Sequence, residues 1–360
     1  MKKSLIALAA LATVATAAQA QSSVTVYGVM DTGIARSTGL AAGSVTYMQN
    51  GGLSTSRFGF RGVEDLGGGL KAKFNLEGGL LDSNGASDAT PLFARAAVVG
   101  LEGAFGEIKL GRQNTIAYDT TVKFDAMGAG NIGGLITTVD GTAAASGSGN
   151  VFNAFGASRW DNAVQYYTPK INGISANAQY RAGGVVGNAS AGKGIAGGLH
   201  YDDGKFAASA VYLAQYAAAA ATGFAAGDKQ LQYYSVYASY DFGVAKVLGG
   251  HSETKGEGAT GSAYKVDYIG AIVPITAPLS ARLSYAKIDN NQTGKKPDQY
   301  AAGLHYAMSK RTTLYTVVAF ASQDGNSALN TVDSGKNAPG YGVVAGNDSK
   351  TYAVGVRHTF

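Results

Sequence analysis

The sequence predicts an all-β fold, a 16-stranded antiparallel transmembrane β-barrel, and three observations support this prediction. Apolar and polar residues alternate with period two over several segments of about ten residues, the length of a strand that crosses a bilayer. Aromatic residues lie near the ends of these segments. Seven short turns join the segments in pairs. A soluble β-sandwich would also alternate, but its strands are commonly only about 5–6 residues long.

The alternation is clearest in three segments: 70–77, 174–181 and 351–360. In the first, Leu70, Ala72, Phe74 and Leu76 share one face, and Lys71, Lys73, Asn75 and Glu77 share the other. Successive side chains of a strand point to opposite faces, so one face of each segment is apolar and the other polar. This is the pattern of a barrel strand between lipid and water.

Aromatic residues near segment ends would form the girdles at the two membrane surfaces. They include Tyr166, Tyr167, Tyr201, Tyr212, Tyr240, Tyr306 and Phe360. The seven short turns lie at 62–69, 103–106, 168–173, 201–204, 240–243, 274–278 and 307–311. With both chain ends on the same side as these turns, the count gives 16 strands and eight longer loops, and an even number is the rule for bacterial barrels.

Composition excludes several other classes of protein. The 360 residues include no Cys, so a disulfide framework, a cysteine zinc site and a thiol nucleophile are excluded. Gly and Pro together make about 16% of the chain, below the level typical of low-complexity disorder. Beyond the first 20 residues, no apolar run approaches the roughly 18 residues of a membrane-spanning helix.

Residues 1–20 have the pattern of a cleaved signal peptide. Lys2 and Lys3 precede an apolar stretch over 5–17, and Ala18-Gln19-Ala20 fits a cleavage site. The stretch is too short for a membrane anchor. We therefore expect a mature chain, 21–360, that forms a single barrel domain. Loss of the two lysines lowers the formal charge from +5 to +3, and so small an excess argues against nucleic-acid binding.

The third long connection, roughly 114–157, stands out by its length. A connection of this length without clear structure is usually functional or disordered. A barrel of 16 strands has a lumen wide enough for an aqueous channel. If this extracellular loop folds inward, it would set the bore.

Five segments spread along the chain carry a family resemblance. They are 23–31, 56–72, 92–101, 105–113 and 354–360. Together they resemble the general diffusion porins of Gram-negative betaproteobacteria. The resemblance implies a trimeric outer-membrane barrel that passes small hydrophilic solutes and ions, with an inward third loop facing an arginine cluster. Departures from the family lie mainly in the long loops, at 143–149 and 217–221.

Strand parity assigns charged side chains to the lumen. Phe58 and Phe60 should face lipid, because the opposite register would place Arg57 and Arg61 there at about 2–4 kcal/mol each near the midplane. The same argument turns inward Lys71, Lys73, Arg95, Glu107, Lys109, Arg159, Arg181 and Arg282, with Asp31 and Glu77. We expect a basic constriction cluster of Arg57, Arg95, Arg61 and Arg159. Arg57 and Arg95 also match the constriction arginines of the family that the chain resembles.

Asp119 and Asp125 are the acids expected to face this cluster from the third loop, with Asp140 as a weaker candidate. Arginines opposite carboxylates across a narrow opening would create a transverse field that selects among solutes. Because the inward set contains more bases than acids, we expect an anion preference. A substrate-selective channel remains an alternative and would need aromatic residues along the lumen. A secreted β-sandwich adhesin is the other alternative.

The sequence offers no catalytic constellation. Its four histidines, at 200, 251, 305 and 358, lie on separate segments without H-x-x-x-H spacing, and no G-x-S-x-G motif occurs. We expect neither enzyme activity nor a metal or cofactor. The expected partners are two further copies in a homotrimer, outer-membrane lipid and lipopolysaccharide, and the assembly machinery. In barrels of the resembled class, a terminal aromatic such as Phe360 resembles the signal that this machinery reads.

Overall fold

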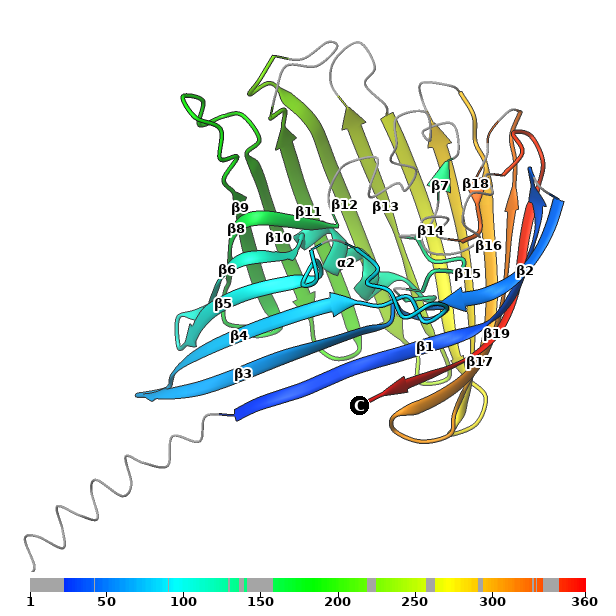
Figure 1. Cartoon of the computed structure of the whole chain (residues 1–360), viewed down its shortest axis with the longest axis horizontal. Helices are drawn as coiled ribbons and strands as arrows, with labels where there is room; N and C mark the ends of the chain where they lie inside the picture. The colour runs from blue at the N-terminus through cyan, green and yellow to red at the C-terminus, as the bar shows by residue number, and fades with distance from the viewer. Residues whose placement is uncertain are drawn as a thin grey trace, which may run out of the picture.

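One antiparallel sheet closes on itself around a central space (Figure 1). The computed structural model describes residues 23–41, 43–89, 91–128, 130–135, 139–140, 158–218, 225–256, 263–290, 294–325, 327, 329–332 and 343–360. The predicted signal peptide lies outside these residues. Within the described residues, no α-helix is both long and apolar enough to cross a membrane.

The wall consists of 17 strand segments. In chain order they are β1 (Ser23–Leu40), β2 (Gly43–Asn50), β3 (Arg57–Gly67), β4 (Leu70–Gly79), β5 (Ala96–Gly103), β6 (Gly106–Asn114), β8 (Arg159–Tyr167), β9 (Ile174–Arg181), β10 (Gly194–Asp202), β11 (Phe206–Tyr216), β12 (Lys229–Asp241), β13 (Lys246–Gly256), β14 (Ala263–Pro274), β15 (Leu279–Asn290), β16 (Asp298–Ala307), β17 (Thr312–Ser322) and β19 (Ser349–Thr359). Helix α2 (Ile116–Phe124) and the short strands β7 (Val139–Asp140) and β18 (Leu329–Asn330) lie in loops.

The 17 segments occupy 16 positions in the wall, which confirms the predicted strand number. Strand β1 pairs with β3 over its first part, Ser23–Val29, and with β2 over its second part, Thr32–Leu40. Strands β2 and β3 are therefore two halves of one wall position, and residues 51–56 leave the wall between them. The seven predicted short turns all join neighbouring antiparallel strands at one end of the barrel.

The prediction of eight long loops is wrong for the first connection, which is short. Strand β1 continues to Leu40 and β2 begins at Gly43, so their connection is a tight hairpin. Gly43 has φ +87°, a conformation that glycine adopts without steric cost. The sequence missed this hairpin because the apolar and polar alternation is weak where both faces of a strand lie outside the membrane.

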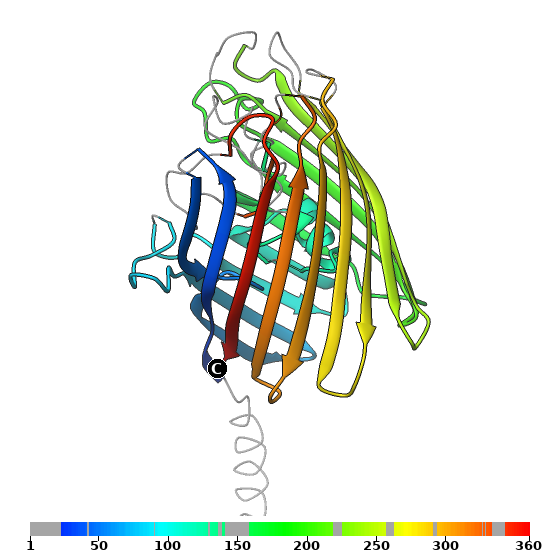
Figure 2. The same cartoon turned by 90° about the vertical axis from the view of Figure 1, so that its right-hand side faces the viewer.

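Closure joins the first strand to the last. Residues Val29 to Thr38 of β1 pair with Thr359 to Lys350 of β19 (Figure 2). The pairing ends at Phe360, whose backbone exchanges two hydrogen bonds of 3.1 Å with Gly28. A side chain at Gly28 would collide with the Phe360 ring, because a Cβ there would lie 2.3 Å from Cζ. This closure removes the free edges of the sheet.

The predicted parity holds along the wall. On β12, Val236 is 62% exposed on the outer face, whereas Tyr237 is only 2% exposed on the inner face. On β19, Val354 and Ala353 alternate in the same way, at 60% and 5%. The inner face is buried here because the third loop covers it.

The third loop follows the inner wall. Helix α2 begins at the N-cap Thr115, whose hydroxyl accepts a hydrogen bond from the Tyr118 amide at 3.2 Å. The helix packs on inward side chains of β11 and β12, and the Phe124 ring stacks on Tyr237 with centroids 5.8 Å apart. The amide of Ala126 then donates to the Tyr268 hydroxyl on β14 at 2.6 Å. The apolar residues of the helix thus hold it against the wall.

The loop continues to the far side of the same wall. The amide of Asn131 donates to the Gly51 carbonyl at 3.1 Å, and that of Gly133 donates to the Thr331 carbonyl at 3.0 Å. A Cβ at Gly133 would lie only 2.5 Å from that of Ala301 on β16, so the loop touches the wall. The small-residue tract at 143–149 lies outside the described residues.

Candidate functional site

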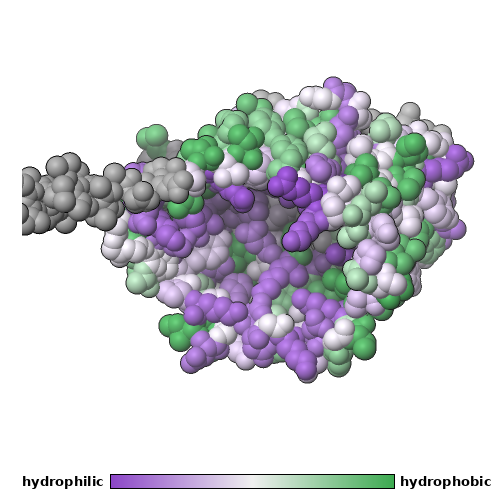
Figure 3. Space-filling model, turned by 90° about the horizontal axis from the view of Figure 1, so that it is seen from below, coloured by the Kyte–Doolittle hydropathy of each residue, from purple (hydrophilic) through white to green (hydrophobic). Residues whose placement is uncertain are grey.

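The third loop covers the inner face of β8–β17 and leaves most of that of β3–β6 open to the lumen. Viewed from the end with the short turns, hydrophilic side chains surround a deep hollow (Figure 3). Most of the basic side chains predicted by parity lie on these open strands, whereas Arg159, Arg181 and Arg282 lie on β8, β9 and β15. This part of the wall is therefore the candidate functional surface.

Three predicted arginines meet around one carboxylate, that of Glu77 on β4. The Nε of Arg95 lies 2.7 Å from Glu77 Oε1, and the Nε of Arg57 lies 3.6 Å from Glu77 Oε2. Arg159, at the start of β8, interacts electrostatically with both Arg95 and Glu77. Arg159 also interacts with Asp88, so three guanidinium groups lie near two carboxylates and this part of the wall is basic.

The basic wall meets the third loop at helix α2. The guanidinium of Arg159 lies over the Tyr118 ring, 5.5 Å from its centroid. The next residue, Asp119, is exposed and accepts a hydrogen bond of 2.7 Å from the Asn114 side-chain amide. It also interacts electrostatically with Lys109 and Arg159. Asp119 is therefore within electrostatic reach of the basic wall.

The other predicted loop acid, Asp125, does not face the lumen, so that prediction is wrong. It is only 4% exposed. Its Oδ1 accepts hydrogen bonds from the Met127 amide at 2.9 Å and the Tyr268 hydroxyl at 3.3 Å, and its Oδ2 accepts one from the Leu135 amide at 2.8 Å. Burial raises the pKa of Asp125 to about 7 despite these three donors. The hydrogen bonds of this carboxyl group stabilise the turn that follows helix α2.

Arg61 faces the lumen but lies apart from the other three arginines. It is four residues beyond Arg57 toward the short turn, and its guanidinium lies 5.0 Å from the centroid of the Tyr27 ring. The Tyr27 hydroxyl donates in turn to Glu77 at 2.9 Å. Arg61 thus lines the approach to the cluster. The weaker candidate Asp140 lies in β7, which pairs with β18.

Arg357 joins the basic wall, and the sequence analysis missed it. It pairs in register with Asp31, and its Nε donates to the Ser54 hydroxyl at 3.0 Å. It also interacts electrostatically with Arg57 and with Arg282, the latter already assigned to the inner face. The parity of the C-terminal segment could have found it, because Arg357 lies on the same face as the buried Ala353.

Asp31 binds the segment 51–56, which leaves the wall between β2 and β3. It is fully buried and accepts hydrogen bonds from the amides of Leu53 at 2.9 Å and Ser54 at 2.8 Å. The Tyr315 hydroxyl on β17 donates to its other oxygen at 2.8 Å. Because three donors engage this carboxylate inside the protein, it contributes little negative charge to the lumen surface.

No group of three or more His, Asp or Glu residues that could hold a metal ion occurs in the part of the chain that the structure describes. The open wall instead carries guanidinium and ammonium groups beside scattered carboxylates. Such a surface can attract, orient and exclude charged solutes.

Comparison with known proteins agrees with this geometry. Residues 7–326 match the family model described as Gram-negative porin. The chain belongs to this family. Outer membrane porin protein 32 of Delftia acidovorans is 37% identical over 100% of both chains, and an outer membrane porin protein of Bordetella pertussis is 31% identical over 89% of this chain and 94% of its own.

A solved structure, described as an anion-selective porin from Comamonas acidovorans, matches with a TM-score of 0.80 and 32% identity. The match covers 94% of this chain and 100% of that one. These findings confirm the predicted family, the 16-stranded barrel and the outer-membrane location. The porin is a channel for passive diffusion across that membrane.

Proposed function

We propose that this porin prefers anions and that its selectivity arises between the basic wall and helix α2. The observation that carries this proposal is that Arg57, Arg95 and Arg159 gather around Glu77, with Arg282 and Arg357 on the same inner face, whereas the nearby acids Asp31 and Asp125 are buried. Low-dielectric walls focus the field of such charges in a narrow lumen. Chloride and small organic anions are then stabilised at the narrowest point, and cations are disfavoured.

The arrangement also supports a transverse field. Arginines line one side of the opening, and Asp119 lies on the other side, on the third loop. Water and dipolar solutes orient in such a field, so small hydrophilic solutes pass more easily than apolar ones. The description of the Comamonas acidovorans structure as anion-selective supports the same direction.

A substrate-selective channel finds less support. Its hallmark would be a track of aromatic side chains along the lumen. Tyr233, Tyr237 and Tyr268 are at most 6% exposed, because helix α2 and the residues after it cover them. The partly exposed Tyr27, Tyr118 and Tyr167 each lie beneath a basic side chain, that of Arg61, Arg159 and Lys109 respectively. The rings of Tyr233, Tyr237 and Tyr268 thus form the surface on which the third loop packs.

We propose a homotrimer that assembles through β1–β6. Outward tyrosines, which mark membrane–water interfaces, all lie on β8–β19 among the described residues. They are Tyr166, Tyr180, Tyr201, Tyr212, Tyr234, Tyr240, Tyr285, Tyr300, Tyr306 and Tyr352. Tyr27 and Tyr47, on β1 and β2, point inward. The outer face of β1–β6 carries aliphatic side chains such as Val24, Val99 and Leu110, which suits contact with another subunit.

The remaining partners follow from location. We propose that residues 1–20 direct export and are removed, that Phe360 serves the outer-membrane assembly machinery, and that the face carrying the tyrosines contacts membrane lipid and lipopolysaccharide. The position of Phe360 supports its proposed role in assembly. It follows the strand that closes the barrel, and it is 47% exposed.

A zero-current potential across a planar bilayer tests the anion preference. With KCl ten times more concentrated on one side, the porin should give a potential of the sign set by chloride. A potential of the potassium sign would refute the proposal, whereas the family and the barrel would stand.

A further inference from the structure

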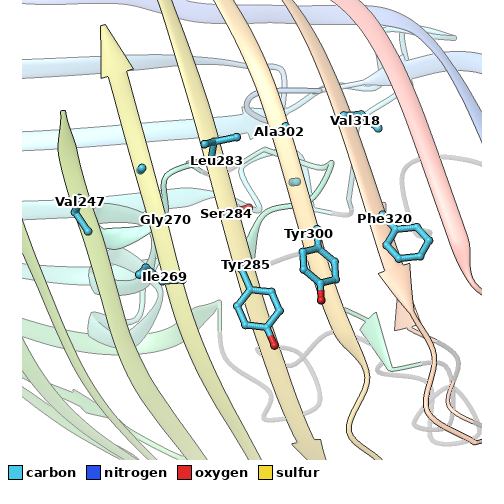
Figure 4. Close-up of a pocket in the computed structure, with 12 residues that line it drawn as sticks. Val247, Ile269, Gly270, Leu283, Ser284, Tyr285, Tyr300, Ala302, Val318 and Phe320 are labelled. Atoms are coloured by element: carbon cyan, nitrogen blue, oxygen red, sulfur yellow. The ribbon is translucent and has the colours of Figure 1, made fainter. Parts of the chain in front are cut away.

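An apolar groove runs along the outer face of β14–β17 (Figure 4). Its volume of about 490 Å³ is within the range of ligand pockets, roughly 300–1,000 Å³. Ala302 lies between the larger Leu283 and Val318, so the small side chain forms the floor. The groove therefore arises because a small side chain lies between larger ones on the face directed toward the membrane.

A row of aromatic rings borders the groove on the side of the long loops. Tyr285, Tyr300 and Phe320 lie directly opposite one another on β15, β16 and β17. Their ring centroids are 5.0 Å and 6.1 Å apart in succession. These rings belong to the girdle at the outer surface of the membrane. The groove thus begins where acyl chains meet headgroups.

A cation ends this row. Lys350 on β19 pairs in register with Phe320, and its ammonium lies 5.3 Å from the centroid of that ring. Arg36 on β1 is the diagonal neighbour of Lys350 on the same outer face, and such neighbours lie about 7–8 Å apart. Arg36 donates to the Thr46 hydroxyl at 3.4 Å. Two cations therefore flank one end of the groove.

Lys350 and Arg36 differ from other outward cations of this girdle in having no acidic partner among the described residues. Within the described residues, neither Lys350 nor Arg36 has a carboxylate within ion-pair distance. Lys255 and Lys265, by contrast, lie 3.6 Å and 3.8 Å from Glu253. Asp298, two residues before Tyr300 on β16, accepts a hydrogen bond of 2.6 Å from the Tyr285 hydroxyl at the opposite end of the row. An anion would therefore bind at the Lys350 end.

We propose that this groove binds an acylated, phosphate-bearing lipid of the outer leaflet, with one acyl chain above Ala302 and a phosphate between Lys350 and Arg36. Two unpaired cations beside an apolar groove complement the two halves of such a lipid. A second subunit is a poorer fit for the groove, because the groove lies on the face that carries the tyrosine girdle. Arg36 lies on β1 where that strand pairs with β19, at the border between this face and the proposed subunit contact. The inference rests on the proposed contact of this face with outer-membrane lipid, for which it names a site, and is independent of the proposed anion preference.

Native mass spectrometry of the folded porin with lipid A in detergent micelles tests the proposal. Arg36→Gln with Lys350→Gln should weaken binding of diphosphorylated lipid A about tenfold and leave the weaker binding of the dephosphorylated form unchanged, because only phosphate contacts are removed. Ala302→Phe fills the groove and should weaken binding of both forms. Lys255→Gln with Lys265→Gln, which removes two outward lysines already paired with Glu253, should leave binding of both forms unchanged.

Each variant is first checked for folding by its heat-dependent shift on an SDS gel, and Lys350→Gln alone replaces the double variant if that one does not fold. Unchanged lipid A binding in both Arg36→Gln/Lys350→Gln and Ala302→Phe overturns the proposal. Equal losses in the Lys255→Gln/Lys265→Gln control also overturn it, because any outward charge would then suffice. None of these outward changes should alter the zero-current potential, so failure of this inference is distinguishable from failure of the anion preference.

Discussion

Replacing Arg57 and Arg95 by serine together should reduce the anion preference of the channel. Both guanidinium groups border Glu77, at 3.6 Å and 2.7 Å, on the wall opposite the third loop. Their loss removes two of the five inward arginines and leaves Arg159, Arg282 and Arg357, so the charge of this part of the wall falls by two. The barrel should still fold, because these side chains face the lumen.

The size of the effect follows from Coulomb's law. A unit charge about 8 Å from a passing ion in water changes its energy by about 0.5 kcal/mol, so two charges contribute about 1 kcal/mol. The energies of anion and cation move in opposite directions, and a Debye length of about 10 Å at 0.1 M salt roughly halves the sum. The permeability ratio of chloride to potassium should therefore fall about fivefold. The channel should keep a weak anion preference, because Arg159, Arg282 and Arg357 remain on the inner face.

The assay is the zero-current potential of single channels in a tenfold KCl gradient. The difference between the porin and its variant should shrink at high salt, where the Debye length is about 3 Å at 1 M. Lys265→Ser with Lys287→Ser is the matched control, since it also removes two positive charges, but from the outer face. An unchanged potential at low salt in the correctly folded Arg57→Ser/Arg95→Ser variant would mean that these arginines do not act on the ion at the narrowest point.

Three further changes have defined outcomes. Glu77→Gln removes the carboxylate that Arg57 and Arg95 share and should raise the anion preference in the same electrical assay; a lower preference would contradict the assigned role of the cluster. Gly28→Leu and deletion of Phe360 should each lower the yield of heat-modifiable folded protein, because both disturb the backbone pairing that closes the barrel; normal yield of both would show that closure does not depend on this contact. Burial raises the pKa of Asp125 from its ordinary value of 3.8 to about 7, so its contribution to stability is complete below about pH 4 and is lost as the pH rises through about 7. The thermal transition of the porin on SDS gels should therefore fall more steeply between pH 5 and 7.5 than that of Asp125→Asn, and equal slopes would refute the shift.

The barrel itself was predictable because its signals are local. Segment 70–77 alternates lysine and acid with Leu and Phe, and the bilayer forces that alternation on any strand that crosses it. The same physics assigned Arg57 and Arg95 to the lumen without any knowledge of their neighbours. Prediction failed at the hairpin of β1 and β2, where Leu40 and Gly43 lie beyond the segments that alternate clearly and no lipid contact imposes a pattern.

The sequence by itself therefore determined the number of strands, the side to which each strand residue points and the basic character of the lumen, because period-two alternation and turn residues act over a few positions. Only the tertiary structure decided the path of the third loop and the partners of Asp31 on β1 and of the loop acid Asp125. The Asp31 carboxylate meets the Tyr315 hydroxyl 284 residues away, and Asp125 meets Tyr268 at a separation of 143. A loop side chain has no parity to direct it, so its direction is set by whichever distant donors the closed barrel brings within hydrogen-bonding distance.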